Sequence, residues 1–174
     1  CHVNVLQTQD HPQFKTYSEE LKWLTTDTTR MTWVANTIKD IATSGNTLIL
    51  VDHISAGELL EKQIKNSVFV SGSTKNMERK EQYDEISTAT NKVIIATYGV
   101  ASVGINIPRI FNLVLIEPGK SFVRVIQSIG RGIRKAEDKD SVQIWDITSS
   151  CKFAKRHLGA RKKFYKEANY PYNI

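Results

Sequence analysis

The apolar residues of this chain occur in short runs that are separated by longer segments of mixed polarity. Five of these runs have the length and the aliphatic or β-branched composition of strands. They cover residues 47–51, 67–70, 93–97, 113–116 and 142–147. Runs such as TLILV and KVIIAT are almost continuously apolar, which favours parallel strands buried on both faces over strands with one face in water.

Helix-length segments separate most of these runs. Residues 56–66 follow the capping pattern Ser55-x-x-Glu58, residues 75–87 follow two hydroxyl residues, and residues 122–135 follow Ser121. Strands that alternate with helices are typical of a parallel sheet with right-handed crossovers. The pattern therefore predicts a doubly wound α/β fold with helices on both faces of the sheet.

The first 46 residues show a different pattern. They begin with the alternating run VNVLQT and continue through a helix predicted from about 28 to 44, which ends at Gly45. We interpret residues 1–46 as a lead-in segment that packs on a domain formed by residues 47–174. Four large apolar residues of this segment are predicted to pack in the core rather than to stack on bases, namely Trp23, Met31, Trp33 and Ile38.

The composition fits a single domain. The chain has 174 residues, of which 40% are hydrophobic, which is enough for an ordinary core. We find no apolar run of the ~20 residues that cross a bilayer and no signal peptide, so we expect a soluble cytoplasmic protein without a membrane partner. A first residue that is Cys rather than Met fits a segment of a longer polypeptide. The two cysteines form no CxxC pair and the four histidines are scattered, so no metal site is predicted.

The positive charge is concentrated at the end of the chain. Residues 151–174 hold seven basic side chains and one acidic side chain, whereas residues 1–150 hold 17 of each, so the net charge of +6 resides in the last segment. A basic helix is predicted over about 151–168. Its apolar face would consist of Phe153, His157, Ala160, Phe164 and Ala168, and its other surface of Lys152, Lys155, Arg156, Arg161, Lys162, Lys163 and Lys166.

This basic helix has two interpretations that the residues leave open. It could be an ordinary solvated surface, as many charge runs are. Alternatively, residues such as Arg156, Lys162 and Lys163 could contact the phosphate backbone of a nucleic acid.

The segment QSIGRGIR is the first candidate for chemistry. On a helix, Gln127, Arg131 and Arg134 would share one face because they are spaced i, i+4 and i+7. Gly130 and Gly132 each cost about 1 kcal/mol in a helix relative to Ala, a penalty that fits a close approach to a ligand. Arginine suits planar contacts with phosphoryl oxygens. A surface helix with ordinary charges remains the alternative.

A second candidate is the segment ATYGVASVGINIP, which directly follows the predicted strand 93–97. In an open parallel sheet, ligands bind beyond the carboxyl ends of the strands. The two glycines Gly99 and Gly104, together with hydroxyl groups and the Asn106 amide, offer small polar groups to a phosphate or a sugar. Such a segment could also be only a turn-rich crossover.

Together these segments resemble superfamily 2 helicases. Ala-Thr followed by GINIP is similar to motif V of that family, and QSIGRGIR is similar to its QxxGRxxR motif VI. Upstream, TLILVDHISAGELL resembles motif IV, and FVSGSTKNMER resembles the element that follows it. The four elements occur in the family's order over residues 47–135. The resemblance is greatest to phage helicases of recombination and repair, which implies the cytoplasm of an infected bacterium.

The resemblance implies a second RecA-like domain, which has the fold of the P-loop NTPases without the P-loop. This domain would face a first RecA-like domain of the same polypeptide across a cleft that holds ATP. Arg134 would be the arginine finger, Arg131 the second phosphate-facing arginine and Gln127 a positioning residue of the same motif. Gly104, Asn106 and Gly130 would line the nucleotide cleft, and Gly72, Ser73, Thr97 and Tyr98 would lie near the DNA or RNA–DNA strand. The spacing before GINIP is one residue longer than in the family, and Asn106 replaces the usual Asp.

The chain lacks half of an ATP site. It contains no GxxxxGK[ST] phosphate loop, because Gly119-Lys120-Ser121 is preceded by Val114 where the first glycine would stand. Asp84-Glu85 imitates the acidic motif but does not follow an apolar strand. ATP and Mg²⁺ are therefore expected to be bound mainly by another domain, and this chain alone is expected to be inactive.

Three functions fit these features. The first is the motor half of an ATP-dependent helicase on branched DNA or RNA–DNA hybrids, in recombination, replication and repair. The second is a non-catalytic nucleic-acid-binding or adaptor module with a helicase-like fold. The third is the motor half of a translocase that moves on duplex without separating its strands.

Overall fold

A computed structural model of the chain describes residues 2–65, 67–70, 92–102, 110–119, 142–167, 170 and 172–173. The strands are β1 (His2–Thr8), β2 (Thr47–Val51), β3 (Ser67–Val70), β4 (Val93–Thr97), β5 (Asn112–Ile116), β6 (Gln143–Ser149) and β7 (Tyr172–Asn173). The helices are α1 (Tyr17–Thr26), α2 (Thr28–Ala42), α3 (Ile54–Gln63), α5 (Tyr98–Ser102) and α7 (Lys152–Glu167). No helix in these ranges is both long enough and apolar enough to cross a membrane.

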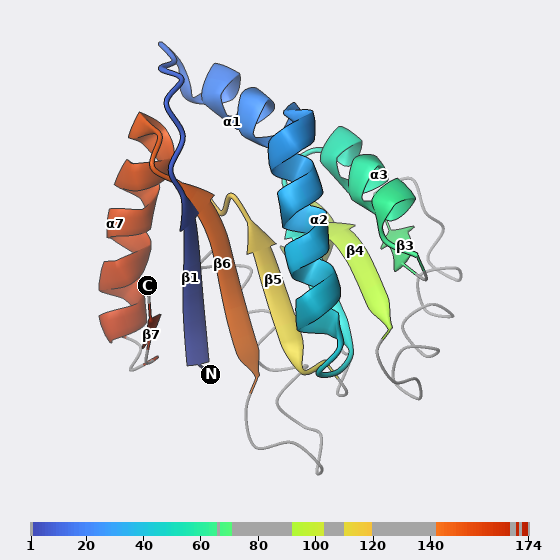
Figure 1. The fold of residues 1–174 in the computed structure, drawn as a ribbon. Coiled ribbons are helices and arrows are strands. Elements are labelled where there is room, and N and C mark those ends of the chain that lie inside the picture. The colour runs from blue at the N-terminus through green and yellow to red at the C-terminus, as the bar shows by residue number, and fades with distance from the viewer. Residues whose placement is uncertain are drawn as a thin grey trace.

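The strands form one parallel sheet at the centre of the molecule (Figure 1). Their order is β3-β4-β2-β5-β6-β1-β7, and every pairing is parallel. The predicted α/β fold is therefore confirmed. Since all strands run in the same direction, their carboxyl ends meet at one edge of the sheet.

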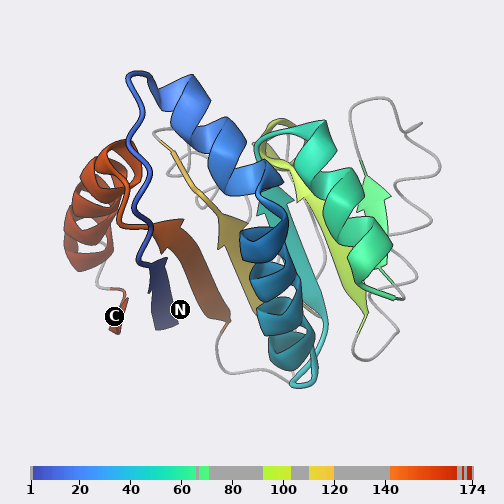
Figure 2. The same ribbon diagram turned by 45° about the horizontal axis from the view of Figure 1, so that its top comes forward.

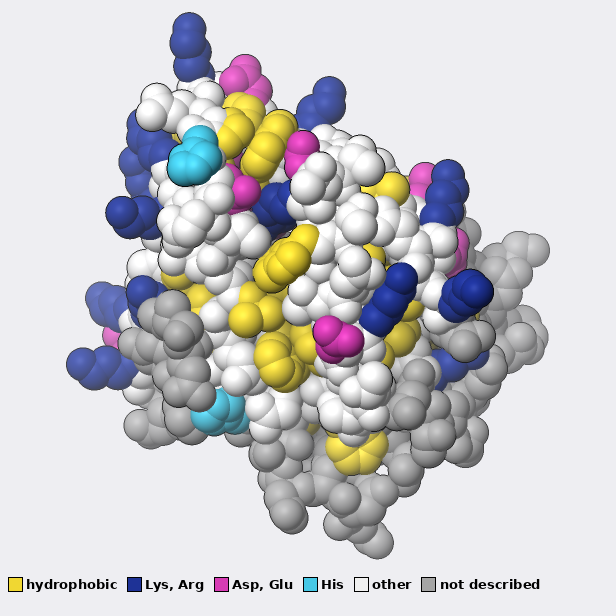
Figure 3. Space-filling model, viewed as in Figure 1, with side chains coloured by type: hydrophobic (Ala, Val, Ile, Leu, Met, Phe, Trp, Pro, Cys, Tyr) yellow, Lys and Arg dark blue, Asp and Glu magenta, His cyan; other side chains and the backbone are white. Residues whose placement is uncertain are grey.

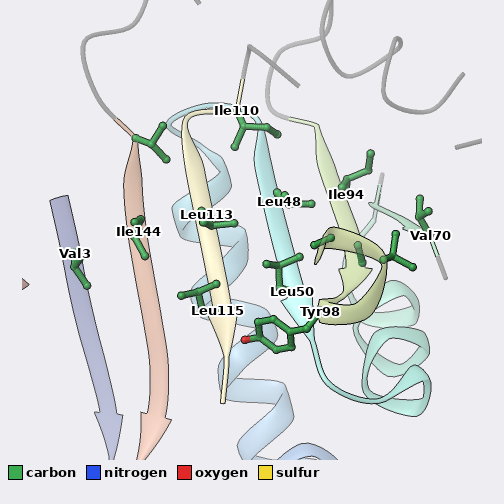
Figure 4. Close-up of a cluster of buried hydrophobic side chains, with 14 of the residues drawn as sticks. Val3, Leu48, Leu50, Val70, Ile94, Tyr98, Ile110, Leu113, Leu115 and Ile144 are labelled. Carbon is green, nitrogen blue, oxygen red and sulfur yellow. The ribbon is translucent and has the colours of Figure 1, made fainter. Parts of the chain in front are cut away.

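Two apolar layers cover the two faces of the sheet. Alternate residues of β2 belong to different layers, since Leu48 and Leu50 lie in one cluster and Ile49 and Val51 in the other. Figure 4 shows the first cluster, in which Tyr98 of α5 joins the strand side chains. Helices α2 and α3 pack on the second cluster, and Figure 2 shows both of them over the same face. The dense core follows from the continuous apolar runs of the central strands.

The sequence predicted the central strands closely and missed two strands, β1 and the two-residue β7. The bounds of β2, β3 and β4 agree with the prediction, and β5 and β6 differ from it by one or two residues at their ends. The lead-in segment is part of the sheet itself, because β1 pairs with β6 from His2 to Thr8. Val3 and Val5 of β1 are buried in the first apolar cluster, and the partly buried Leu6 packs against the second.

Helix α2 begins and ends as local chemistry dictates. The Asp27 carboxylate accepts a hydrogen bond from the Arg30 backbone N–H at 3.0 Å, which caps the first turn. Beyond its end, Gly45 has a φ of 151°, and a Cβ there would lie 2.8 Å from a ring carbon of Phe111. Only glycine fits this turn without strain.

The predicted cap of α3 was wrong. The helix begins at Ile54 with His53 as its N-cap, so Ser55 lies within the first turn and does not precede the helix. No side chain caps this end. The His53 carbonyl accepts hydrogen bonds from the N–H groups of Ala56 and Gly57, which close the first turn soon after β2.

The four apolar residues of the lead-in segment have different environments. Met31 and Ile38 are fully buried and Trp23 is partly buried, in agreement with a packing role. Trp33, by contrast, is 41% exposed. It lies two positions after Met31 and so faces away from the sheet.

Candidate nucleotide and nucleic-acid site

Most of the predicted site residues lie outside the described part of the chain. This applies to the motif VI residues Gln127, Gly130, Arg131 and Arg134, to the motif V residues Gly104 and Asn106, and to Gly72 and Ser73. Their roles stay predictions. The described residues do define the strand ends from which these segments continue.

Thr97 and Tyr98 stand where β4 ends and α5 begins. The Thr97 hydroxyl accepts a hydrogen bond from the Val100 N–H at 3.2 Å, so it caps the short helix. The Tyr98 side chain is 7% exposed, and its hydroxyl donates to the Ile116 carbonyl at 3.0 Å. Burial raises the pKa of the Tyr98 phenol well above its usual value. Any contact of Tyr98 with a nucleic acid would therefore involve its backbone.

A buried ion pair lies at the carboxyl end of β5. The Arg30 guanidinium of α2 donates to the Glu117 carboxylate through Nη2, and both side chains are 4% exposed. The Thr148 hydroxyl donates to the same carboxylate at 3.3 Å. Burial raises the pKa of Glu117 to about 7, although Arg30 opposes this shift. The pair joins α2 to the point where the chain leaves β5.

Further hydrogen bonds fix the Arg30 guanidinium. It donates to the Leu24 carbonyl at 2.7 Å and to the Thr148 carbonyl at 3.1 Å. Its Nε lies 3.6 Å from the Asp10 carboxylate, which follows β1. The arginine thus connects α1, β1, β5 and β6, which is the arrangement that a buried charge requires.

A second buried arginine reaches the same region from α7. Arg161 is 1% exposed and binds the Asp146 carboxylate with two hydrogen bonds, of 2.7 and 2.9 Å. The Tyr165 hydroxyl donates to Asp146 at 2.8 Å. The remaining Arg161 nitrogen, Nη1, donates to the Pro118 carbonyl at 2.6 Å. Helix α7 is therefore bound to β6 and to the residue that follows Glu117.

The burial of these charged residues was not predicted from the sequence, although signals were present. Asp146 interrupts the apolar run of β6, and Arg30 lies beside Met31 on the apolar face of α2. A charged residue on a buried face normally has a partner of opposite charge. Which residue supplies that partner depends on the tertiary structure.

The predicted faces of α7 need correction. The buried residues are Ala154, Leu158, Arg161 and Tyr165, whereas Phe153, His157 and Phe164 are half-buried and Ala160 is exposed. Arg161 therefore lies on the buried face and not on the surface. Two adjacent faces of α7 carry apolar residues. The more aromatic one was predicted to be buried, because the face that is buried contains the charged residue Arg161.

The other basic residues of α7 form a continuous surface, which we call the basic face. It consists of Lys152, Lys155, Arg156, Lys162, Lys163 and Lys166. At about 100° per residue, they occupy roughly one third of the helix circumference. Lys162 is half-buried and the other five are exposed. Figure 3 shows Lys and Arg side chains gathered along the left edge, over α7.

The basic face has few contacts with described side chains and lies beside a cavity. Within the described residues, none of its members forms an ion pair, and only Lys152 and Arg156 contact an aromatic ring, that of Phe153. An open cavity of about 710 Å³ lies between the first turn of α7 and the segment that follows β1. The cavity is lined by Asp10, His11, Pro12, Gln13, Phe14, Ser150, Cys151, Lys152 and Lys155.

Among the described residues, no group of three or more His, Cys, Asp or Glu side chains could hold a metal ion.

Comparison with known proteins shows the protein family to which this domain belongs. The chain belongs to the family of the helicase conserved C-terminal domain, whose model matches residues 29–136. This range contains the segments that resemble motifs IV, V and VI. The resemblance in the sequence is thereby confirmed at the level of the family.

Two curated relatives are similar in sequence. The chain is 32% identical over 155 residues to the ATP-dependent DNA helicase UvsW of Enterobacteria phage T4, covering 86% of this chain and 31% of the phage protein. It is 34% identical over 104 residues to putative helicase 22 of a Sulfolobus islandicus filamentous virus, covering 58% of this chain and 18% of that protein. The chain thus spans a third or less of the length of these relatives.

Solved structures share the fold. The crystal structure of T4 UvsW superimposes with a TM-score of 0.82 at 24% identity, over 99% of this chain and 40% of that one. The C-terminal domain of the DEAD-box protein Dbp5 superimposes with a TM-score of 0.65 at 17% identity, over 98% of this chain and 88% of that domain. The fold is therefore that of the RecA-like C-terminal domains of helicases.

Proposed function

We propose that this chain is the C-terminal motor half of an ATP-dependent helicase that acts on branched nucleic acids, such as R-loops, forks and four-way junctions. The processes it would serve are recombination, replication and repair. The observation that carries the proposal is the family match over residues 29–136, together with the motif order inside it. The likeness to UvsW, an ATP-dependent DNA helicase, supports the choice of DNA as a substrate, and we extend the proposal to RNA–DNA hybrids.

The active site would form between this domain and an N-terminal RecA-like domain of the same polypeptide. ATP and Mg²⁺ would be held mainly by that other domain, since this chain has no phosphate-loop sequence. Arg134 and Arg131 would stabilise charge on the transferred phosphoryl group, and Gln127 would assist them. Gly104, Asn106 and Gly130 would line the nucleotide cleft.

The nucleic acid would contact two parts of the domain. Gly72, Ser73, Thr97 and the backbone of Tyr98 would lie near the strand, beyond the carboxyl ends of β3 and β4. Arg156, Lys162 and Lys163 of the basic face would contact phosphates. Arg156 and Lys163 are exposed and Lys162 is half-buried, and none of the three forms an ion pair with a described acidic residue. These features support the role, because unpaired surface cations attract a polyanion.

The decisive experiment replaces the predicted arginine finger in the full-length protein. Arg134→Ala should lower the kcat of DNA-stimulated ATP hydrolysis by ~10³-fold or more while ATP and a forked oligonucleotide still bind. Lys39→Ala, at an exposed position of α2, serves as the matched control and should leave kcat unchanged. Near-normal turnover by Arg134→Ala would refute the assignment.

Substrate comparison tests the finer part of the proposal. The full-length protein should hydrolyse ATP faster with forked, R-loop and four-way-junction substrates than with linear duplex, and it should displace a strand. Hydrolysis without strand displacement would indicate a duplex translocase instead. This chain alone should not hydrolyse ATP, and measurable turnover by it would contradict the two-domain site.

A further inference from the structure

Three successive residues at the end of β5 are each held by a side chain from a different element. The Ile116 carbonyl accepts the Tyr98 hydroxyl of α5 at 3.0 Å. The Glu117 carboxylate pairs with Arg30 of α2. The Pro118 carbonyl accepts Arg161 Nη1 of α7 at 2.6 Å. Figure 4 shows the Tyr98 hydroxyl directed toward β5 near its lower end.

The conformation at this point depends on its surroundings. Glu117 has a φ of 45°, in the left-handed region that residues other than glycine rarely adopt. Such a conformation persists only where neighbouring groups determine it. The Glu117 N–H donates to the Ile147 carbonyl at 2.9 Å, and Tyr98, Arg30 and Arg161 are at most 7% exposed. Side chains and backbone together therefore set the direction in which the chain leaves β5.

Two of the elements that meet there, and the chain that continues from Pro118, have separate roles in the proposed function. Tyr98 begins the segment that continues to Gly104 and Asn106 at the nucleotide cleft. Arg161 belongs to α7, whose opposite side is the basic face. Pro118 precedes the segment with Gln127, Arg131 and Arg134. The end of β5 thus contacts α5, which precedes the predicted nucleotide-binding residues in the sequence, and α7, which carries the basic face.

We propose that Tyr98 and Arg161 are positioning residues for ATP hydrolysis. Through the Ile116 and Pro118 carbonyls they fix the direction in which the chain leaves β5, upstream of the predicted arginine finger in the sequence. This inference rests on the proposed function. In this inference Tyr98 acts through its hydrogen bond to the Ile116 carbonyl, and Arg161 acts through its hydrogen bond to the Pro118 carbonyl and not by binding phosphates as part of the basic face. Small displacements of a catalytic group can cost up to about 100-fold in rate, so loss of these bonds should lower kcat.

The test uses Tyr98→Phe and Arg161→Lys in the full-length protein. Tyr98→Phe removes only the hydroxyl, and Arg161→Lys keeps the charge near Asp146 but loses the fork that also reaches Pro118. We expect each variant to lower kcat for fork-stimulated ATP hydrolysis about tenfold, with the KM for ATP and the Kd for the fork changed less than twofold. Because both act through β5, the double variant should lose much less than the product of the two effects.

A matched control separates positioning from stability. Thr47→Val removes another buried hydroxyl, which donates to the Gly45 carbonyl at 3.1 Å at the amino end of β2, the sheet edge opposite the end of β5. It should lower the Tm without changing kcat. A kcat of wild-type size in Tyr98→Phe and Arg161→Lys, or a loss no larger than that in Thr47→Val, would overturn the inference. If Arg161→Lys does not fold, Tyr98→Phe decides alone by the same criterion.

Arg134→Ala, measured in parallel, distinguishes the two proposals. Collapse of its turnover together with unchanged kcat in Tyr98→Phe and Arg161→Lys would leave the proposed function standing and reject the positioning role. Wild-type turnover in Arg134→Ala would reject the proposed function and, with it, the inference that depends on it.

Discussion

Two regions of this domain concentrate charge, and they do so in opposite ways. At the carboxyl edge of the sheet, Arg30 and Arg161 are almost fully buried and are paired with Glu117 and Asp146. On the basic face of α7, six cations lie side by side, and none of them has an ion-pair partner among the described residues. Arg161 and Lys162 are adjacent in sequence, yet they belong to different regions.

The difference shows what each kind of charge can do. A buried pair costs desolvation energy, so it needs several well-directed hydrogen bonds, and these bonds fix the geometry of the elements that it joins. An exposed cation costs little and adds little stability, but it remains available for a polyanion. The buried region should therefore govern folding and geometry, and the basic face should govern binding.

The largest expected effect comes from leaving a buried arginine without its partner. Asp146→Ala would strand Arg161 inside the domain and should destabilise the chain by about 3–5 kcal/mol. Urea unfolding monitored by circular dichroism would measure this loss. Asp40→Ala, the same change at an exposed position of α2, should stay within about 0.5 kcal/mol. Equal effects of the two substitutions would remove the contrast between the regions.

The next effect is a pH dependence that the Glu117 carboxyl contributes. Its pKa is raised from 4.5 to about 7 in the folded chain, so the folded state binds a proton more readily than the unfolded state does. This group therefore makes stability fall as the pH rises from about 4.5 to about 7.

Substitution isolates this contribution from that of other titrating groups. Glu117→Gln should flatten the fall by up to about 3 kcal/mol across that window, as unfolding at a series of pH values would show. The exposed Glu58→Gln should leave the pH profile as it is in the parent chain. A Glu117→Gln profile parallel to the parent would mean that burial does not shift this carboxyl.

A smaller effect is expected from one hydroxyl in the buried region. Tyr165→Phe removes the bond of 2.8 Å to the Asp146 carboxylate and should cost about 2 kcal/mol, because hydrogen bonds to charged groups contribute more than neutral ones. Combining it with Asp146→Asn in a double-mutant cycle should give less than the sum of the single losses. Strict additivity would show that the two groups do not interact.

The smallest effect on stability, and the one specific to binding, concerns the basic face. Lys162→Gln combined with Lys163→Gln should change the free energy of unfolding by less than about 0.5 kcal/mol. It should weaken binding of the full-length protein to duplex DNA and reduce the slope of log Kobs against log[salt] by about 2. Lys22→Gln with Lys39→Gln, on α1 and α2, is the control. An unchanged slope would make the basic face an ordinary solvated surface.

Local patterns were sufficient for most of the fold. The central strands β2, β3 and β4 were predicted to the residue, because continuous apolar runs between helical segments have few other solutions in a parallel sheet. The family was identified from the motif order alone, and the family match confirms it. The individual roles of Gln127, Arg131 and Arg134 stay predictions, since they lie outside the described residues.

Short-range patterns failed where a residue's environment depends on distant partners. The run VNVLQT gave no indication that β1 would pair with β6, some 140 positions later, because pairing is decided by the whole sheet. The N-cap of α3 was predicted at Ser55, two residues after the observed N-cap His53, because the pattern Ser55-x-x-Glu58 does not indicate where the chain turns after β2.

The amino-acid sequence by itself determined the parallel α/β core, the helicase family and the position of the positive charge along the chain. Only the tertiary structure decided how that charge is divided. Periodicity assigned Arg161 to the surface, because its own side chain is charged and the neighbouring face is aromatic. The fold places Asp146, Tyr165 and Pro118 around it instead. The physical reason is that the cost of burying a charge depends on its partners, and those partners come from segments far apart in the sequence.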